Sequence, residues 1–399
     1  PRSPGYLSKP EYEHLAERNC ELYMSSAWFT SHWSYKKLQT YFSLMLNDKK
    51  KYFCCGLPYQ LAIKEGLLFR EQVEDEMSEA DFDATSFSME MGALWLGDSD
   101  DAFFKFDDIS PRRKLKHSYF PLEIYKAHRI KIPPLALNER RILSVDVALM
   151  ASKKHNNDAA ALIINSAIPT ERSDYISNIV YIETHEGMTT DELGLLVMRF
   201  FYQYKCTDLV LDTGGQGLGV YDFIIKNQYD PEYDVTYEAL TCCNNEDMAD
   251  RCKVRNAKKA IWSIKATAEF NSNAAIGLRA GFQNGVINLL IPDLEAEQEI
   301  QKIRGFGKMS EREKALLQAP YTQTSLLINE LIYLDHEMKG NTVKIKERPG
   351  MRKDRFSSLE YNFQICQDLS RKRRPQENTE SLVKRLAIRQ PKRFSMFAE

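Results

Sequence analysis

The chain has 399 residues, of which 43% are hydrophobic and 28% charged, and its formal net charge is −2. That length is too great for one ordinary core and predicts two domains, while the balance of apolar and charged residues is typical of a globular protein. No apolar run approaches the roughly 18 residues that cross a bilayer, and a net charge near zero excludes a uniformly basic surface as the basis for nucleic-acid binding.

Charge is distributed unevenly along the chain. Residues 74–108 are strongly acidic, whereas the end is basic, beginning with Arg371-Lys372-Arg373-Arg374. This asymmetry predicts either an arm at 372–399 that binds a polyanion or a solvated tail with no binding role.

The eight cysteines are scattered rather than arranged as a disulfide framework. Cys242-Cys243 with Cys252 lacks the C-x2-C spacing of a structural zinc site. We therefore expect reduced thiols, which predict a cytoplasmic setting.

Three regions and a tail follow one another along the chain. Residues 1–110 mix loops with short apolar runs that predict strands, for example Leu22-Tyr23-Met24 and Tyr52-Phe53-Cys54-Cys55. Residues 111–139 are punctuated by prolines and predict a linker. A domain is expected at 140–371, followed by the basic tail.

The 140–371 domain alternates between strand and helix patterns. Its expected elements are strands at 142–148, 159–164 and 179–182, a helix at 189–204, a strand at 209–212, a helix after Gly214-Gly215-Gln216-Gly217, helices at 257–279 and 324–338, a strand at 343–346 and a last helix at about 355–369. The helix at 189–204 begins with Thr-Thr-Asp-Glu, an N-cap with an acidic first turn. An antiparallel meander followed by crossover helices and parallel strands predicts a mixed α/β sheet.

Three aspartates occupy positions where chemistry is expected. Asp146 lies on the first strand, on the face opposite its two valine neighbours. Asp212 ends an apolar strand, and in open α/β sheets ligands bind at the carboxyl ends of strands. Asp354 begins the last helix. Each also has an ordinary explanation, as a surface acid, a turn residue or a helix cap.

Together the three acids predict a metal site. Carboxylates brought close together repel one another unless a cation compensates them. Ligands that are all oxygen favour Mg²⁺ or Mn²⁺ over zinc. Two such ions can activate a water and stabilise the leaving oxygen of a phosphodiester. Acids on the first strand, the fourth strand and a late helix are the arrangement of ribonuclease H-like nucleases.

Three stretches resemble the large terminase subunits of tailed bacteriophages. The first runs from Ser144-Val145-Asp146-Val147-Ala148 to Asn157-Asp158-Ala159-Ala160, and the second is Val210-Leu211-Asp212-Thr213 with the glycines that follow it. The third is the most specific and spans 346–361, Lys-Glu-Arg-Pro-Gly-Met-Arg-Lys-Asp-Arg-Phe-Ser-Ser-Leu-Glu-Tyr. The resemblance covers nearly all of 140–370.

The resemblance implies a fold, an activity and a set of partners. The fold would be a ribonuclease H-like mixed sheet flanked by helices, and the activity metal-dependent cleavage of concatemeric double-stranded viral DNA during genome packaging. Asp146, Asp212 and Asp354 would be the catalytic residues and would hold two Mg²⁺ or Mn²⁺ ions, with Asp158 as a supporting acid. The partners would be double-stranded DNA, the small terminase subunit and the procapsid portal, on which the chain could form a homo-oligomer, in the host cytoplasm and not at a membrane.

The first region resembles the end of a terminase packaging ATPase. Ser25-Ser26-Ala27 is similar to the motif that couples ATP hydrolysis to movement, and residues 87–104 resemble the closing segment of that domain. No G-x4-G-K-[ST] occurs, and no strand ending in Asp-Glu lies before residue 20, so the phosphate-binding elements are missing. We expect 1–110 to be part of a P-loop-type ATPase domain, ATP to be used only by the full-length protein, and the chain to be a fragment.

Basic residues near the acids are expected to contact DNA phosphates, or else to form an ordinary amphipathic surface. They are Lys253, Arg255, Lys258, Lys259, Lys265, Arg352, Lys353 and Arg355. The glycines at 214, 215, 217 and 219 do not match G-x-G-x-x-G, so we interpret them as a permissive turn beside Asp212. Two other functions stay open: a ribonuclease H-like resolvase or integrase, and a DNA-clamping module whose acidic site no longer cleaves.

Overall fold

The computed structural model describes residues 9–11, 21–28, 30, 33–47, 51–78, 87, 89–95, 102–148, 159–171, 174–340, 342–348 and 351–373. The chain divides into two compact units, residues 1–99 and 100–399. The division therefore lies before the stretch predicted as a linker. That stretch forms part of the second unit, because β1 (Arg113–Leu115) joins its sheet and the Arg113 guanidinium donates to the carbonyl oxygens of Leu290 and Ile291, both at 3.0 Å.

In the first unit, the described residues form the helices α1 (Trp33–Met45), α2 (Tyr59–Lys64) and α3 (Arg70–Ser78) and no strand. The strands predicted at 22–24 and 52–55 are wrong. An extended run needs a neighbouring strand to satisfy its backbone groups, and none is present among these residues. Leu22 and Met24 are accordingly 81% and 85% exposed. The assignment of 1–110 to a P-loop-type ATPase stays a prediction.

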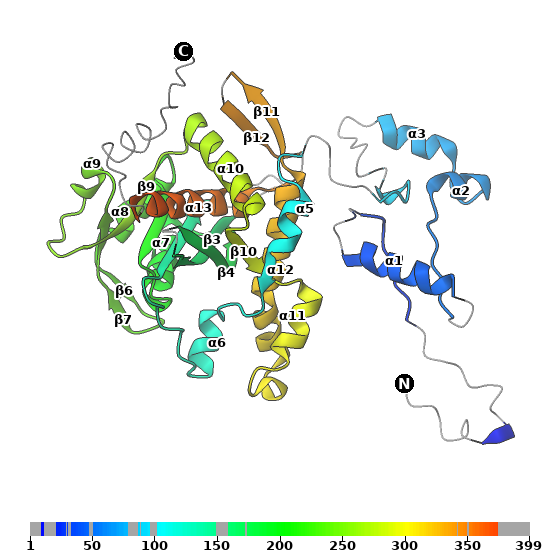
Figure 1. The fold of residues 1–399 in the computed structure, drawn as a ribbon, viewed down its shortest axis with the longest axis horizontal. Helices are drawn as coiled ribbons and strands as arrows, with labels where there is room; N and C mark the ends of the chain where they lie inside the picture. Colours follow the sequence, from blue (N-terminus) through cyan, green and yellow to red (C-terminus); the bar gives the residue numbers. More distant parts are fainter. Residues whose placement is uncertain are drawn as a thin grey trace, which may run out of the picture. The chain divides into compact units, whose positions relative to one another are not determined.

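Eight strands among the described residues of the second unit form one sheet, in the order β1-β10-β4-β3-β2-β5-β9-β8. Figure 1 labels β3, β4, β9 and β10 of this sheet. After β1, they are β2 (Arg140–Asp146), β3 (Ala160–Pro169), β4 (Tyr175–His185), β5 (Asp208–Asp212), β8 (Leu240–Cys242), β9 (Lys258–Ile264) and β10 (Ile287–Leu290). β2, β3 and β4 form an antiparallel meander, and β5 and β9 continue from β2 in parallel. This confirms the predicted mixed α/β sheet, in which an antiparallel meander is followed by parallel strands.

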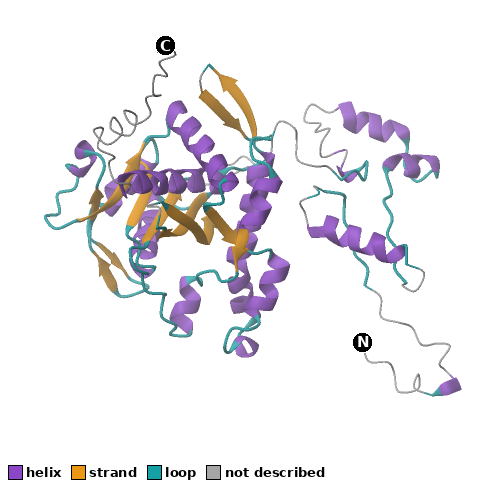
Figure 2. Cartoon of the chain, viewed as in Figure 1, coloured by secondary structure: helices purple, strands orange, loops and turns teal. Residues whose placement is uncertain are grey.

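Helices cover both faces of this sheet (Figure 2). The larger ones are α7 (Thr190–Gln203), α8 (Gly217–Ile224), α10 (Ala268–Gln283), α12 (Glu311–Tyr333) and α13 (Asp354–Arg373). Smaller elements are α5 (Phe106–Ile109), α6 (Leu122–Ala127), α9 (Glu246–Ala249), α11 (Asp293–Ile300), the strand pairs β6 (Gln228–Asp230) with β7 (Val235–Tyr237) and β11 (Asp335–Lys339) with β12 (Thr342–Lys346), and two 3-10 turns, Ser110–Arg112 and Phe306–Lys308. No described helix is both long and apolar enough to cross a membrane.

The alternation of side chains along β2 and β5 decides what each face carries. Leu143 and Val145 of β2, with Leu209 and Leu211 of β5, belong to one buried apolar cluster with side chains of α7 and α8. Because successive residues of a strand point to opposite faces, the residues between and after them face the other way. α13 packs on that second face, against β2, β3, β4 and β5, with α10 and α12 beside it.

Most elements form where the sequence predicts them, and α7 shows why. The side chain of its N-cap, Thr189, accepts a hydrogen bond from the Glu192 backbone N–H, and the Glu192 carboxylate accepts one from the Thr189 backbone N–H, so two donors at the helix start are satisfied. The helix predicted at 257–279 is wrong in its first part. Residues Lys258–Ile264 form β9, whose last five side chains are buried inside the sheet, where β-branched and aromatic residues pack well.

A buried polar seam fixes α13 on the sheet; we use the name polar seam for Ser144, Asn165, Ser358 and Asn362, all fully buried. The Asn362 amide nitrogen donates to the Ile142 carbonyl oxygen at 3.2 Å and to Ser144 Oγ at 3.0 Å. Its amide oxygen accepts from Asn165 Nδ2 at 2.9 Å, and Ser144 Oγ lies 2.9 Å from Ser358 Oγ. Hydrogen bonds are directional, so the seam sets both the rotation and the axial position of α13.

Removing the central amide of the seam should therefore be costly. Asn362→Ala leaves buried partners unsatisfied and opens a cavity, so we expect the free energy of unfolding in urea to fall by about 2–4 kcal/mol. Gln364→Ala, on the same helix but partly exposed, is the control and should cost about 0.5 kcal/mol or less. A loss for Asn362→Ala as small as that of the control would show that the seam does not hold the helix.

Candidate active site

Asp146 and Asp212 end two neighbouring parallel strands. Val145 pairs with Leu211 in the register of β2 and β5, so the residues that follow these two lie side by side, about 5 Å apart at the backbone. Both aspartates are half-buried. Alternation puts both on the face that carries α13, because the preceding Val145 and Leu211 point into the cluster under α7 and α8. The two predicted acids are thus brought together at the carboxyl end of the sheet.

The glycine-rich turn after β5 holds the Asp212 carboxylate in place. The Gly214 backbone N–H donates to Asp212 Oδ1 at 2.9 Å. Gly215 has a φ of +50°, which favours glycine. A Cβ on Gly217 would lie 1.8 Å from the Asp212 carbonyl oxygen, so α8 can begin here only with glycine. The turn predicted as permissive is therefore required for the close approach of α8 to β5.

Asp354 lies at the same end of the sheet, on the other side of β2. It is the first residue of α13 and is 7% exposed. Its Oδ2 accepts a hydrogen bond from the Ala159 backbone N–H at 3.0 Å. Ala159 stands just before β3, whose Ala161 pairs with Asp146. The third predicted acid is therefore anchored beside the strand pair that carries the first.

Glu330 of α12 fixes the beginning of α13. Its Oε2 accepts from the Phe356 backbone N–H at 3.0 Å, and its Oε1 pairs with the Arg355 guanidinium at 2.5 Å. Burial raises the pKa of Glu330 to about 7, against the lowering effect of Arg355. The carboxylate satisfies backbone donors that a helix leaves open at its first turn.

Glu360 and Tyr361 were not predicted as site residues. Glu360 is 3% exposed, and its Oε1 has no hydrogen-bond partner among the described residues. Burial, and then the charge of Asp146, hold the pKa of Glu360 well above its usual range. Burial first, then the charges of Asp146, Glu360 and Asp212, raise the pKa of Tyr361. The sequence signal was an acid between two large apolar residues, Leu359 and Tyr361, in the middle of a helix.

Asp146, Asp212 and Asp354 lie at the same edge of the sheet, but the described residues do not form a complete metal site there. Among the described residues, no three side chains of His, Cys, Asp or Glu are grouped so as to hold a metal ion. Asp158, the predicted supporting acid, falls in 149–158, outside the described residues. Asp146 and Asp212 are therefore paired by the strand register, with Asp354 at the same edge.

The predicted DNA-contact residues are divided between the two ends of the sheet. Lys258 and Lys259 begin β9, which runs parallel to β5 with Asp212 opposite Ile264, so these lysines lie at the end away from the acids. Lys265 follows Ile264 and is exposed at the acidic end. The three lysines were predicted to lie on one helix at 257–279. Because Lys258–Ile264 forms a strand, Lys258 and Lys259 lie at one end of the sheet and Lys265 at the other.

The remaining predicted basic residues make contacts within the protein. Arg352 pairs with Glu186 at 2.6 Å, and Lys353 with Glu347 at 2.7 Å, just before Asp354. Arg355 is committed to the internal pair with Glu330. Lys253 donates to the Asp250 carbonyl oxygen at 2.6 Å, and Arg255 is exposed.

In the first unit, the predicted ATPase coupling motif forms a local turn contact. Ser25 Oγ donates to the Ser26 carbonyl oxygen at 2.8 Å, and Ala27 is buried. No strand precedes this motif among the described residues of the unit. Its coupling role stays a prediction.

No protein-family model matches the sequence, and no curated protein does. Among solved structures, the large terminase nuclease of thermophilic phage G20c with bound cobalt is 9% identical, with a TM-score of 0.36 over 67% of this chain and 98% of that one. The nuclease domain of the large terminase subunit of bacterial virus Sf6 is 9% identical, with a TM-score of 0.34 over 66% and 97%. The chain is similar to large terminase nucleases.

The HK97 bacteriophage large terminase is a further similar structure, 7% identical with a TM-score of 0.30, over 58% of this chain and 40% of that one. Identities and TM-scores this low for the large terminase nucleases do not carry residue roles across to this chain. The fold assignment therefore depends on the strand order of the sheet, and the site assignment on the placement of this chain's own acids.

The close approach at Gly217 can be tested directly. Gly217→Ala would force its Cβ against a backbone oxygen, so the β5–α8 turn has to move and the Asp212 carboxylate with it. We expect a loss of about 2–4 kcal/mol in urea denaturation. Gly307→Ala, where an added Cβ meets nothing within 4 Å, should change stability by about 0.5 kcal/mol or less. Equal stability of the two variants would rule out the close approach.

The raised pKa of Glu330 predicts a pH dependence of stability. Because the pKa of Glu330 rises from its usual value of 4.5 to about 7 on folding, protonation of Glu330 stabilises the fold fully below pH 4.5, and this contribution is lost as the pH rises through 7. Wild type should therefore lose stability relative to Glu330→Gln between pH 5 and pH 8 in matched thermal melts. A difference between the two that is constant over this range would contradict the raised pKa.

Proposed function

We propose that the second unit is a metal-dependent endonuclease that cuts double-stranded viral DNA during genome packaging, as part of a terminase large subunit. The observation that supports this most is the pairing of Asp146 and Asp212 at neighbouring parallel strand ends. Asp354 lies at the same edge on a helix that the polar seam holds in register. Like charges at this spacing are costly without a cation.

The donor set fits Mg²⁺ or Mn²⁺. The acids of this edge offer only carboxylate oxygens, which these ions prefer over the nitrogen and sulfur donors that suit zinc. Glu360 adds a buried carboxyl oxygen without a hydrogen-bond partner among the described residues. Asp146, Asp212 and Asp354 would hold the ions. When bound, the ions supply an activated water and stabilise the leaving oxygen of the phosphodiester.

The chain's own residues position the substrate and the carboxylates. The Gly214 N–H orients the Asp212 carboxylate, and the Ala159 N–H orients that of Asp354. Lys265 at the same edge offers positive charge to DNA phosphates. Contacts of this kind bind the backbone without reading bases, so little sequence preference is expected.

A non-cleaving DNA-clamping module is the second candidate. It is favoured by one observation: the described acids are not grouped so as to hold a metal. Metal dependence of stability separates the two functions, because a ligand that binds only the folded state raises its melting temperature. The packaging ATPase activity, the small terminase subunit and the portal are proposed here from the sequence resemblance alone.

Single substitutions of the acids should abolish cleavage. Asp146→Asn, Asp212→Asn and Asp354→Asn should each reduce nicking of plasmid DNA in Mn²⁺ by more than about 100-fold. Their melting temperatures without metal should be unchanged or higher, because a carboxylate charge is removed from the cluster.

Asp222→Asn is the matched control for these variants, since Asp222 pairs with Arg251 on the surface of α8 and should leave cleavage intact. Cleavage at the wild-type rate by any two of the three acid variants would refute the assignment.

A further inference from the structure

A groove lies at the opposite end of the sheet from the acids. Its volume is about 620 Å³, and we call it the tyrosine–lysine groove after Tyr125, Tyr202, Tyr233, Lys126, Lys131 and Lys205, which line it. It lies between α6, the segment before β2, the end of α7 and the β6–β7 turn. Since Lys205 precedes β5 and the acids end β2 and β5, about one strand length, roughly 20 Å, separates the groove from the candidate active site.

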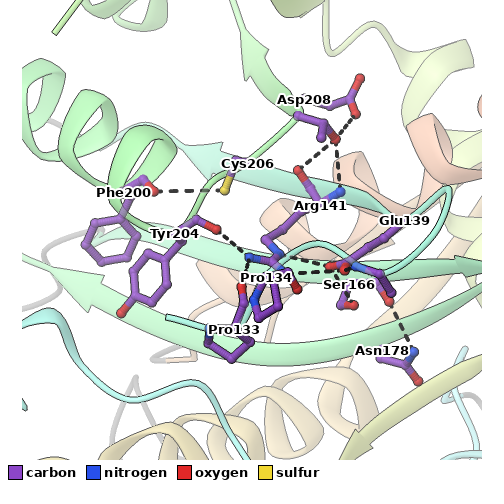
Figure 3. Close-up of polar contacts among 12 residues, drawn as sticks. Pro133, Pro134, Glu139, Arg141, Ser166, Asn178, Phe200, Tyr204, Cys206 and Asp208 are labelled. Carbon is purple, nitrogen blue, oxygen red and sulfur yellow. Dashed lines mark hydrogen bonds and ion pairs between the residues drawn. The ribbon is translucent and has the colours of Figure 1, made fainter. Parts of the chain in front are cut away.

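The groove is preformed by a buried guanidinium. Arg141 is fully buried and paired with Glu139 (Figure 3). Its Nη1 donates to the carbonyl oxygens of Pro133 at 3.1 Å and Tyr204 at 2.7 Å, and its Nη2 to that of Pro134 at 3.2 Å. The Arg141 side chain therefore connects the two segments on either side of the groove, 133–134 and 204–205. Such rigidity lowers the conformational cost of binding.

The tyrosine rings are also held in place. Tyr202 stacks on Tyr237 with ring centroids 5.3 Å apart. Lys126 Nζ lies 4.3 Å from the centre of the Tyr233 ring and donates to the Glu232 carbonyl oxygen at 2.8 Å. The rings present fixed aromatic surfaces to whatever enters the groove.

Strained backbone positions surround the groove. The non-glycine residues with positive φ that the structure describes in the second unit are Arg129, Asn138, Lys205 and Asp234, at +50°, +58°, +57° and +49°. Lys205 lines the groove, Arg129 and Asp234 are next in sequence to lining residues, and Asn138 lies farther along the segment before β2. Glycine would adopt these conformations at lower cost. Lys205 thus holds a left-handed conformation at a position where the backbone alone favours glycine.

The chemistry of the lining indicates its occupant. No acidic side chain lines the groove, and the described residues provide no ion-pair partner for Lys131 or Lys205. Its lining also includes the aliphatic side chains of Leu122, Ile130 and Ile132. A DNA duplex has no apolar side chain to place in such a hollow, whereas a peptide does.

We propose that the tyrosine–lysine groove docks a segment of an acidic protein partner. Carboxylates of the partner meet Lys126, Lys131 and Lys205, and an aliphatic or aromatic side chain of the same segment enters between the tyrosines. The site is independent of the endonuclease proposal, because it shares no residue with the acidic edge.

The test uses the full chain and a random library of displayed 12-residue peptides. Peptides are selected on wild type and counter-selected on Lys131→Glu/Lys205→Glu, with Lys226→Glu/Lys308→Glu, two exposed lysines elsewhere on the unit, as the control. We expect peptides that carry at least two Asp or Glu together with a large apolar residue. Their affinity should fall at least tenfold in the groove variant and in high salt, and stay unchanged in the control.

Lys205→Gly separates binding from folding. It removes one groove charge and relieves the strained φ, so it should be at least as stable as wild type while it binds the selected peptides more weakly.

Failure to recover peptides that distinguish wild type from the groove variant, or recovery of neutral or basic peptides, would overturn the proposal. It would also be overturned if a 20-base-pair duplex lost tenfold affinity in the groove variant, since the groove would then bind nucleic acid.

Discussion

The hydrogen bonds of Asn362 to β2 are the constraint on which the candidate site depends. Asn362 reaches the Ile142 carbonyl oxygen and Ser144 Oγ from within α13. Ser144 is two residues before Asp146 on the same face of β2, so a shift of the helix by one turn would separate Asp354 and Glu360 from the strand ends. An apolar contact would not specify the register in this way, because apolar packing is not directional.

Acidic residues at one edge are held there by hydrogen bonds from the backbone. Asp212 accepts from the turn that follows it, and Asp354 accepts from the start of β3. The Glu330 side chain accepts a hydrogen bond from the Phe356 backbone N–H in the first turn of α13. The fold thus keeps several carboxylates close together without gathering them into a complete ligand set, an arrangement that a bound cation would stabilise.

Local patterns in the sequence were enough to predict the strands that carry the site. The run of β-favouring residues at 142–148 identified β2, and helical periodicity with the capping signal at Thr189 identified α7. The segment Lys258–Ile264 was predicted as helix because the spacing of its lysines is also typical of the charged face of a helix. It forms a strand because its last five side chains are buried inside the sheet. The burial of Glu360 depends on neighbouring helices far away in the sequence, and the groove depends on Arg141, whose partners no spacing rule predicts.

We propose that Asp146 and Asp212 together hold a divalent cation at the carboxyl edge of the sheet. Anomalous diffraction from crystals of the chain soaked in MnCl₂ tests it most directly. We expect a peak beside the two carboxylates, which is lost in Asp146→Asn. A map from a Mn²⁺-soaked crystal with no peak at this edge, or with the metal held by other residues only, would contradict it.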